Sequence, residues 1–328
     1  MDPKTLALVG GILAVLAIAT TGGQFLKRHP DTGLNAAAVR TFNERLRAWW
    51  LICSALAAAL LIGDAVTFAL FGFISFWALR EFITLTPTRG GDHRALFWVF
   101  FLFTPLQYLL VSFNQYELFN VFIPVYAFLF TLARVAMSGD YKRFLERTAK
   151  IQAGLLICVY SLSYAPALLN LNLYTWNEEG ARVIWSGVKG SNVLLLFFLI
   201  LVVQVSEAMQ YLWGKLLGRR LIAPEISHNR TWEGFLGGVG SATLLGAGLW
   251  WATPFEPWVA ALMALVISVM GFAGGMTMSA IKRDRGVKDY GTLVEGHSGV
   301  LDRIDSICFA APVFFHLTRA YFEVGVPT

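Results

Sequence analysis

Charged side chains are scarce in this chain. Of its 328 residues only 14% are Asp, Glu, Lys or Arg, while 56% are hydrophobic, and the mean hydropathy is +0.60. A soluble domain carries about 25% charged residues, so a chain with so few could not cover its surface with polar groups. The scarcity excludes an ordinary soluble protein and predicts an all-α, polytopic integral membrane protein.

Cysteine is also rare, and its placement excludes a cysteine-based metal site. Cys53, Cys158 and Cys308 lie in apolar runs, and no two have the spacing of metal ligands. We therefore interpret them as buried hydrophobic residues of helices. Internal repeats, low-complexity segments and a soluble domain are lacking as well. The net charge of +5 comes from loops between apolar segments, so we expect no nucleic-acid partner.

Long apolar runs are what the chain has in abundance. A helix needs about 20 apolar residues to cross a bilayer. The sequence predicts about ten such segments, at residues 5–23, 47–62, 65–83, 95–112, 118–137, 150–171, 191–213, 234–252, 257–280 and 305–323. The second and third are separated only at 63–65, which we interpret as a tight helical hairpin. Lys27 and Arg28 follow the first segment, which favours an anchor over a cleaved signal peptide.

Basic residues accumulate on one side of these segments. About twenty Lys and Arg residues lie in the loops after the odd-numbered segments, against Arg182 and Lys189 in the opposite loops. Because cytoplasmic loops are rich in Lys and Arg, residues 24–46 are expected to be cytoplasmic and both termini non-cytoplasmic. We interpret Arg80 as an anchor whose charge reaches the membrane surface. No organelle-targeting segment is evident, so we expect the cell inner membrane.

The chain divides by polarity into two regions. Residues 1–190 hold about six predicted spans, whereas residues 191–328 also contain two polar segments at the cytoplasmic ends of helices, 214–238 and 279–305. Both polar segments combine glycines, hydroxyl groups and basic side chains. An orientation signal needs only the bases, so the C-terminal region is predicted to be catalytic.

In residues 279–305 the polar side chains are spaced to meet at the membrane surface. Ser279, Lys282 and Arg283 share one helix face. Asp302 and Asp305 share a face at the start of the last segment, where the helix dipole favours acids. Carboxylates with open positions bind Mg²⁺, which keeps waters and substrate phosphates as its other ligands, and Lys and Arg bind phosphate oxygens. The segment therefore predicts a nucleotide-phosphate transfer site.

These residues resemble the signature of the phosphatidate cytidylyltransferase family, S-x-x-K-R-x4-K-D-x-G…G-H-x-G-x-x-D-R-x-D. The matching positions are Ser279, Lys282, Arg283, Lys288, Asp289, Gly291, Gly296, His297, Gly299, Asp302, Arg303 and Asp305. The stretch APEISHNRTWEGFLGG is similar to a second element of the family. Its matching positions are Ser227, Thr231, Glu233, Gly234, Gly237 and Gly238, with Arg230 where lysine is usual. The resemblance covers residues 200–323.

The resemblance implies transfer of a cytidylyl group from CTP to phosphatidic acid, giving CDP-diacylglycerol and pyrophosphate, with Mg²⁺ as cofactor. The attacking lipid phosphate is already anionic, so no general base is needed. It also implies that Asp302 is the main Mg²⁺ ligand, with Asp289 and Asp305 as further ligands or orienting groups. The implied phosphate-binding bases are Lys282, Arg283, Lys288 and Arg303. Further implied substrate-binding residues are Ser227, Arg230, Thr231, Glu233 and Ser279, while His297 holds either the glycine turn or a phosphate. A homodimer is also implied.

The chain departs from the family pattern at several positions. Proline, glycine and proline are usual where this chain has Glu295, Ser298 and His228. Aspartate is usual where this chain has Glu207 and Gly275. Glycine offers no metal ligand, so either Glu207, Glu233 or Glu295 supplies the missing charge or metal binding is weaker. Because acids within a membrane are costly, we predict that Glu207 faces the site and binds metal.

Three other functions remain open from the sequence. A close relative could act on another lipid phosphate, such as a polyprenyl phosphate, because the lipid cavity is generic apolar helix. A non-catalytic descendant could bind lipid or a partner enzyme, which Gly275 favours. A transporter is disfavoured, since transporters show paired repeats and polar groups at the membrane midplane, whereas the charges here lie at the cytoplasmic edge.

Overall fold

The computed structural model describes residues 53–85, 88–176, 182–184, 192–227, 229–287 and 299–324, and the single residues Gly10, Ala17, Thr20, Thr21 and Trp50. The chain forms two compact units, Met1–Thr67 and Phe68–Thr328. In the first unit the indole of Trp50 donates a hydrogen bond of 3.0 Å to the Thr20 hydroxyl. The apolar helix Cys53–Ile62 ends at Gly63, whose φ of +141° suits glycine.

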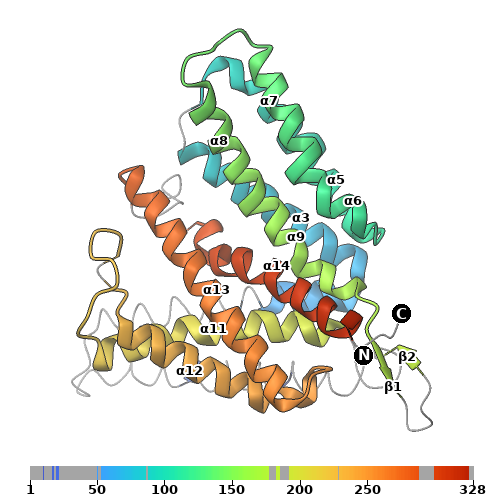
Figure 1. Cartoon of the computed structure of the whole chain (residues 1–328), viewed down its shortest axis with the longest axis vertical. Helices are drawn as coiled ribbons and strands as arrows, with labels where there is room; N and C mark the ends of the chain where they lie inside the picture. The colour runs from blue at the N-terminus through green and yellow to red at the C-terminus, as the bar shows by residue number, and fades with distance from the viewer. Residues whose placement is uncertain are drawn as a thin grey trace. The chain divides into compact units, whose positions relative to one another are not determined.

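The described residues are almost entirely helical, in agreement with the predicted fold class (Figure 1). The elements before residue 171 are α3 (Asp64–Leu85), η2 (Gly90–Asp92), α4 (His93–Trp98), η3 (Val99–Phe103), α5 (Thr104–Ser112), α6 (Tyr116–Val121), η4 (Phe122–Ala127), α7 (Phe128–Ala136), α8 (Phe144–Gly154), η5 (Leu155–Ser161), α9 (Leu162–Ala167) and η6 (Leu168–Asn170). The later helices are α11 (Asn192–Leu217), α12 (Trp232–Gly248), η7 (Trp250–Ala252), α13 (Pro257–Asp284) and α14 (Leu301–Val324).

One small β-hairpin was not predicted. Strands β1 (Tyr174–Trp176) and β2 (Arg182–Ile184) pair antiparallel, with Thr175 opposite Val183. The hairpin lies in the loop between the sixth and seventh predicted spans. Each strand has three residues, too few for alternation of polar and apolar side chains to be recognised in the sequence.

Three long helices contain a wide, π-type turn, at η3, η4 and η5. Two of these turns lie at or near a proline, because Pro105 is the second residue after η3 and Pro124 lies within η4. Proline lacks the N–H that continues an α-helix, and a wide turn accommodates its ring. At η3 the hydroxyl of Thr104 donates a hydrogen bond of 2.9 Å to the carbonyl of Val99.

Six helical stretches of the described chain are long and apolar enough to cross a membrane. They are Asp64–Leu85, Gly90–Ser112, Tyr116–Ala136, Phe144–Asn170, Asn192–Leu217 and Pro257–Asp284. These six correspond to the third to seventh and the ninth predicted spans. The eighth and tenth coincide with α12 and α14, which are helical but are not among the six. Most of the first predicted span lies outside the described residues, and the second includes the short helix Cys53–Ile62.

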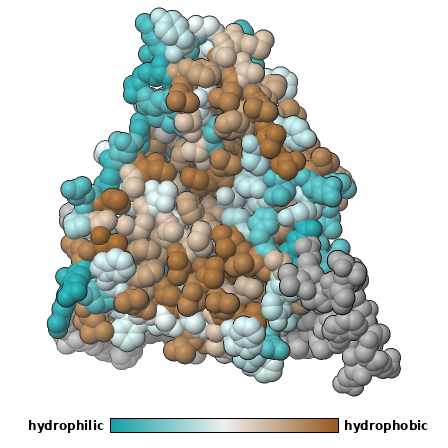
Figure 2. Space-filling model, in the orientation of Figure 1, coloured by the Kyte–Doolittle hydropathy of each residue, from teal (hydrophilic) through white to brown (hydrophobic). Residues whose placement is uncertain are grey.

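Large apolar side chains lie on the outside of these helices, as a lipid-facing surface requires. Phe73, Phe101, Leu129, Leu244 and Trp258 are each more than half exposed. Figure 2 shows broad hydrophobic areas across the visible face of the described residues, with hydrophilic residues gathered at its margins. This distribution supports a multi-pass membrane protein.

Helices α11, α12, α13 and α14 pack against one another and hold both motif segments (Figure 1). Glycines permit the close approach. A Cβ at Gly238 would lie 2.2 Å from Cγ of Gln210, and one at Gly246 would lie 2.2 Å from Cβ of Ala264. Gly238 belongs to the second motif element and lets α12 pack against α11, whereas Gly246 lies beyond that element and lets α12 pack against α13. Helix α14 also contacts α9 and η5, so it joins the motif helices to the preceding ones.

Candidate active site

The acidic end of the signature lies at the start of α14, against the last turn of α13. Nζ of Lys282 lies 2.7 Å from Oδ1 of Asp302. Their side chains retain 14% and 10% of their exposure, so the pair is within reach of a ligand but largely screened from water. The ends of α13 and α14 thus bring together two signature residues twenty positions apart, as the motif predicts.

Glu81 of α3 holds the first turn of α14 in place. Its carboxylate accepts hydrogen bonds from the amides of Val300 and Leu301, at 3.0 and 2.8 Å, and from the indole of Trp77 at 3.1 Å. Glu81 is 8% exposed. The first N–H groups of a helix have no partner within it, and an acid there also complements the helix dipole. Glu81 therefore fixes the backbone from which Asp302 projects.

One turn further along α14, a second group of acids is present. The hydroxyl of Ser306 donates a hydrogen bond to the carboxylate of Glu207 in α11, and the amide of Ser306 donates to Oδ1 of Asp305 at 2.7 Å. Asp305 is 9% exposed and interacts electrostatically with Glu207, Lys282 and Arg230. Glu207 therefore points toward α14 and the signature acids rather than outward to lipid, as predicted.

Residues 218–231 form a loop closed by its own hydrogen bonds. The hydroxyl of Thr231 accepts a 3.1 Å hydrogen bond from the amide of Gly234 and caps α12, an arrangement favoured by threonine at this position. The carboxylate of Glu233 accepts hydrogen bonds of 3.1 and 3.2 Å from the amides of Arg219 and Arg220. Both side chains thus shape the loop, and their predicted role in substrate binding stays a prediction.

Arg230 lies at the meeting of α11, α13 and α14. Its Nη1 donates a 2.7 Å hydrogen bond to Oε1 of Gln210, and its guanidinium carbon lies 5.7 Å from the centre of the Phe272 ring. Gln210 is buried and donates in turn to the hydroxyl of Ser206 at 2.9 Å. The loop therefore brings a positively charged side chain into electrostatic interaction with Asp305.

Two other predicted residues have local roles. The hydroxyl of Ser279 donates a 2.6 Å hydrogen bond to the carbonyl of Gly275, one turn earlier in α13. Nε of Arg283 donates to the carbonyl of Ile226 at 3.1 Å, and the residue is exposed. Arg283 thus joins the end of α13 to the 218–231 loop that contains Ser227. Arg303 lies in the first turn of α14 and is half-buried.

The central part of the signature lies outside the described residues. It includes Lys288, Asp289 and His297, and also Glu295 and Ser298. Their predicted roles stay predictions. His228, the variant position of the second element, is outside the described residues as well.

The described acids suit a Mg²⁺ ion that arrives with its substrate. Among the residues that the structure describes, no three His, Cys, Asp or Glu side chains gather as a ready metal cage. Mg²⁺ does not require one, since it commonly binds one or two carboxylates and takes its other ligands from water and phosphate. Asp302 offers one such carboxylate, and Asp305 with Glu207, which interacts with it electrostatically, offers two more one turn further along α14. Bound there, Mg²⁺ would neutralise charge on a nucleotide phosphate.

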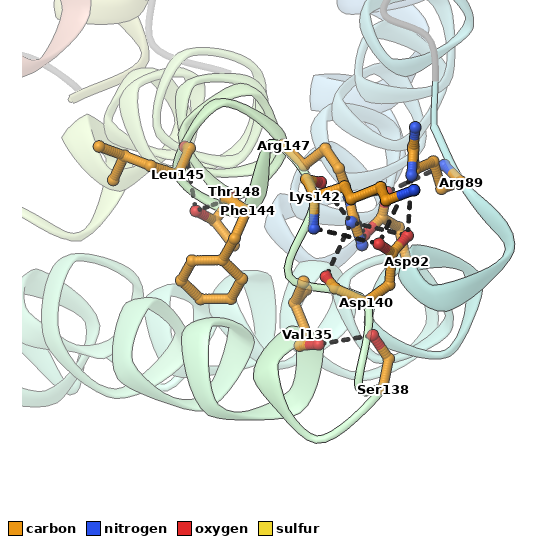
Figure 3. Close-up of polar contacts among 10 residues, drawn as sticks. All are labelled: Arg89, Asp92, Val135, Ser138, Asp140, Lys142, Phe144, Leu145, Arg147 and Thr148. Atoms are coloured by element: carbon orange, nitrogen blue, oxygen red, sulfur yellow. Dashed lines mark hydrogen bonds and ion pairs between the residues drawn. The ribbon is translucent and has the colours of Figure 1, made fainter.

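A second charged cluster has a different organisation (Figure 3). Arg147 in α8 forms an ion pair with Asp92, with Nη2 2.5 Å from Oδ1, and its Nη1 donates to the carbonyls of Asp140 and Lys142 at 3.0 and 2.9 Å. Arg147 and Asp92 are 5% and 0% exposed. Arg89 reaches Asp140 from outside at 3.3 Å. We call Arg89, Asp92, Asp140 and Arg147 the closed cluster.

Comparison with known proteins identifies the class to which this site belongs. The cytidylyltransferase family matches residues 43–321 of the chain. The Escherichia coli protein YnbB, described as uncharacterized, is 38% identical over 312 residues, which are 94% of this chain and 96% of that protein. Two proteins named phosphatidate cytidylyltransferase match shorter regions. The Synechocystis protein is 44% identical over 108 residues, 32% of this chain and 36% of that protein. The Staphylococcus aureus protein is 35% identical over 127 residues, 38% of this chain and 48% of that protein.

The chain belongs to the cytidylyltransferase family, which makes it a nucleotidyltransferase. The likeness extends over nearly the whole length of one relative. By contrast, the chain aligns with less than half the length of the two relatives whose names state an activity.

Proposed function

We propose that this protein transfers the cytidylyl group of CTP to a membrane lipid phosphate, with phosphatidic acid as the acceptor. An anionic oxygen of the lipid phosphate forms a bond to the α-phosphorus of CTP. The bond from that phosphorus to the bridging oxygen breaks, and pyrophosphate leaves with the electron pair. CDP-diacylglycerol is the lipid product, and the reaction belongs to phospholipid biosynthesis.

The observation that supports this proposal is the convergence of charges at the start of α14. Asp302 with Lys282, and Asp305 with Glu207 and Arg230, lie between helices whose outer faces are apolar. The reaction joins two polyanions, so its barrier depends on bringing them together and neutralising charge. Lys282 and Arg230 would bind phosphate oxygens, while Asp302 and Asp305 would orient Mg²⁺ with Glu207 as a further ligand.

The topology belongs to the proposal. We infer about ten spans with both termini on the non-cytoplasmic side of the cell inner membrane, so that the site opens to the cytoplasm, where CTP is made. Residues 1–190 would form a scaffold of about six helices and residues 191–328 the catalytic region. Arg283, Lys288, Asp289 and Arg303 would complete the phosphate and metal contacts, with a homodimer as the assembly.

The test is product formation by the purified protein from radiolabelled CTP, phosphatidic acid and Mg²⁺. We expect a CDP-lipid from the wild type and a loss of about 1,000-fold or more in Asp302→Ala, because a metal-binding carboxylate is removed. Asp284→Ala is the matched control. Its side chain is 66% exposed and pairs with the adjacent Arg285, so the variant should keep full activity.

Two other outcomes would change the conclusion. Product from a polyprenyl phosphate but not from phosphatidic acid would keep the reaction and replace the acceptor. A folded wild type that binds lipid but forms no product from any lipid phosphate would establish a non-catalytic descendant.

A further inference from the structure

The guanidinium of Arg230 lies where a side chain at position 275 would begin. A Cβ built on Gly275 would lie 3.1 Å from Nη2 of Arg230 and 3.7 Å from the hydroxyl oxygen of Ser306. A separation of 3.1 Å is tighter than ordinary contact, so a side chain added at this position would require the guanidinium to shift by a few tenths of an ångström. Glycine at position 275 therefore leaves room for the Arg230 guanidinium in the position that it takes.

The guanidinium is held in that position from two sides. Gln210 accepts a hydrogen bond from Nη1, and the ring of Phe272 lies under the guanidinium. A cation over an aromatic face is stabilised, more so where water is partly excluded. Arg230 itself is half-buried, so the arrangement differs from a surface arginine that moves freely.

The guanidinium retains donors for a ligand. Arginine has five N–H groups in a planar fork, and within the described part of the chain only Gln210 accepts a hydrogen bond from them. Asp305 lies close enough to interact with the charge electrostatically. Such a fork matches the geometry of two phosphate oxygens, which a lysine ammonium does not.

We propose that Arg230 and Gly275 act as one unit. Because residue 275 has no side chain, the Arg230 guanidinium has room to bind a substrate phosphate, and it does so in place of one divalent cation. The inference rests on the proposed function, because it assigns the charge balance of the same site. In the family pattern an aspartate is usual where this chain has Gly275, and a carboxylate there would attract a cation. In this chain the guanidinium of Arg230 supplies the positive charge that such a cation would supply.

The experiment compares four variants of the full-length protein in detergent by kcat and KM for CTP and lipid. Arg230→Lys should lower kcat/KM about 100-fold, the scale of losing one donor to a developing phosphate charge. Gly275→Ala should lower it about 10-fold, because the methyl group shifts the guanidinium. Arg230→Lys/Gly275→Ala should be no worse than Arg230→Lys, since lysine has no Nη2 for the methyl group to meet.

Gly271→Ala is the matched control. Gly271 lies one turn earlier in α13, and its Cβ would meet Cβ of Ser306 at 3.5 Å, an ordinary contact. We expect activity within about twofold of wild type, because the methyl group fits without displacing a neighbour. Equal effects of Gly271→Ala and Gly275→Ala would overturn the proposal, as would losses from Arg230→Lys and Gly275→Ala that multiply in the double variant.

Metal binding supplies a readout that does not depend on turnover. The number of Mn²⁺ ions bound per chain in the presence of CTP is measured by electron paramagnetic resonance. We expect one in the wild type and two in Arg230→Lys/Gly275→Asp, where a carboxylate replaces the guanidinium. Two Mn²⁺ ions per chain in the wild type would overturn the proposal. If the double variant does not fold, the Mn²⁺ count of Arg230→Lys is compared with that of the wild type instead.

The two proposals fail separately. If no lipid phosphate is converted but the Mn²⁺ counts follow the expected pattern, the reaction is wrong and the Arg230–Gly275 unit stands. If CDP-diacylglycerol forms and the two substitutions act independently, the reaction stands and the unit is wrong.

Discussion

The closed cluster and the candidate active site are both built from acids and bases on neighbouring helices, yet they differ in how the charges are used. In the closed cluster, both terminal nitrogens of Arg147 and its Nε have partners within the protein, and Asp92 has no exposed surface. At the start of α14, Lys282 and Asp302 come from two different helices, and their side chains keep 14% and 10% of their exposure. Burial of charge is therefore common to both regions, and the candidate site differs in that its charged pair lies at the junction of helices and keeps some exposure.

The largest effect is expected from breaking the closed cluster. Arg147→Met leaves the Asp92 carboxylate buried without its main partner, so the free energy of unfolding should fall by about 3–5 kcal/mol. Activity per folded molecule should be unchanged. Thermal unfolding in detergent measures the first quantity and CDP-lipid formation the second. An Arg147→Met protein that melts like wild type would show that the two regions do not differ as described.

The next effect tests the link between α3 and the site. Glu81→Ala leaves the amides of Val300 and Leu301 without their acceptor, which should cost about 2 kcal/mol of stability. It should also lower kcat more than it raises KM, because the first turn of α14 positions Asp302. Arg80→Ala is the control, since Arg80 is exposed and its guanidinium packs over Trp77 at 5.1 Å. Equal kcat values in the two variants would contradict a positioning role for Glu81.

A smaller effect separates charge from shape at the site. Glu207→Gln keeps an oxygen that can accept the Ser306 hydrogen bond, so the melting temperature should hardly change. Loss of the carboxylate charge should lower activity about 10- to 100-fold and raise the Mg²⁺ concentration needed for half-maximal rate. The measurement is a Mg²⁺ titration of wild type and variant. Full activity at low Mg²⁺ would remove Glu207 from the ligand set.

The smallest effect is expected at the outer edge of the closed cluster. Loss of water around the Asp140 carboxyl acts to raise its pKa, but the Lys142 amide, Arg89 and Arg147 lower the pKa overall. A depressed carboxyl pKa stabilises the fold above the unfolded pKa, near 3.8, and this contribution is lost as pH falls through the folded pKa. Arg89→Ala should lower the melting temperature slightly at pH 6, and the difference should shrink below pH 4. A difference that does not depend on pH would exclude the ion pair as its cause.

Much of the candidate site could be predicted from residues that lie close together in the sequence. Lys282 and Asp302 were predicted to lie in one pocket, and the packing of α13 against α14 brings them together as an ion pair. The predicted inward orientation of Glu207 followed from the cost of a charge in lipid. Six of the predicted spans are confirmed as long apolar helices because hydrophobic length alone determines them.

Glu81 was missed because its partners are backbone amides about 220 residues away. Nothing local distinguishes it from an interfacial acid, and the sequence drew attention to its neighbour Arg80 instead. A general rule would have found it, since an acid inside an apolar segment is a candidate functional residue. Gln210 is likewise unremarkable until the 218–231 loop brings Arg230 beside it.

Arg147 shows a different limit of the sequence. Counting basic residues by loop treated it as one of the cytoplasmic charges, whereas it lies within α8 and is buried. Assigning Arg147 to a loop does not change the predicted orientation, because that orientation depends on about twenty basic residues. The wide turns η3, η4 and η5 were also not predicted, since each shifts the helical period in the middle of a uniformly apolar run.

The cap that Glu81 provides has a consequence for biogenesis. During synthesis this glutamate enters the membrane long before Val300 and Leu301 have been made, and an acid among apolar helices is costly while those partners are missing. Arrival of α14 satisfies the carboxylate and brings Asp302 into place in the same event. A chain interrupted before α14 therefore lacks two of the three hydrogen-bond donors that the structure describes for Glu81 and also lacks Asp302.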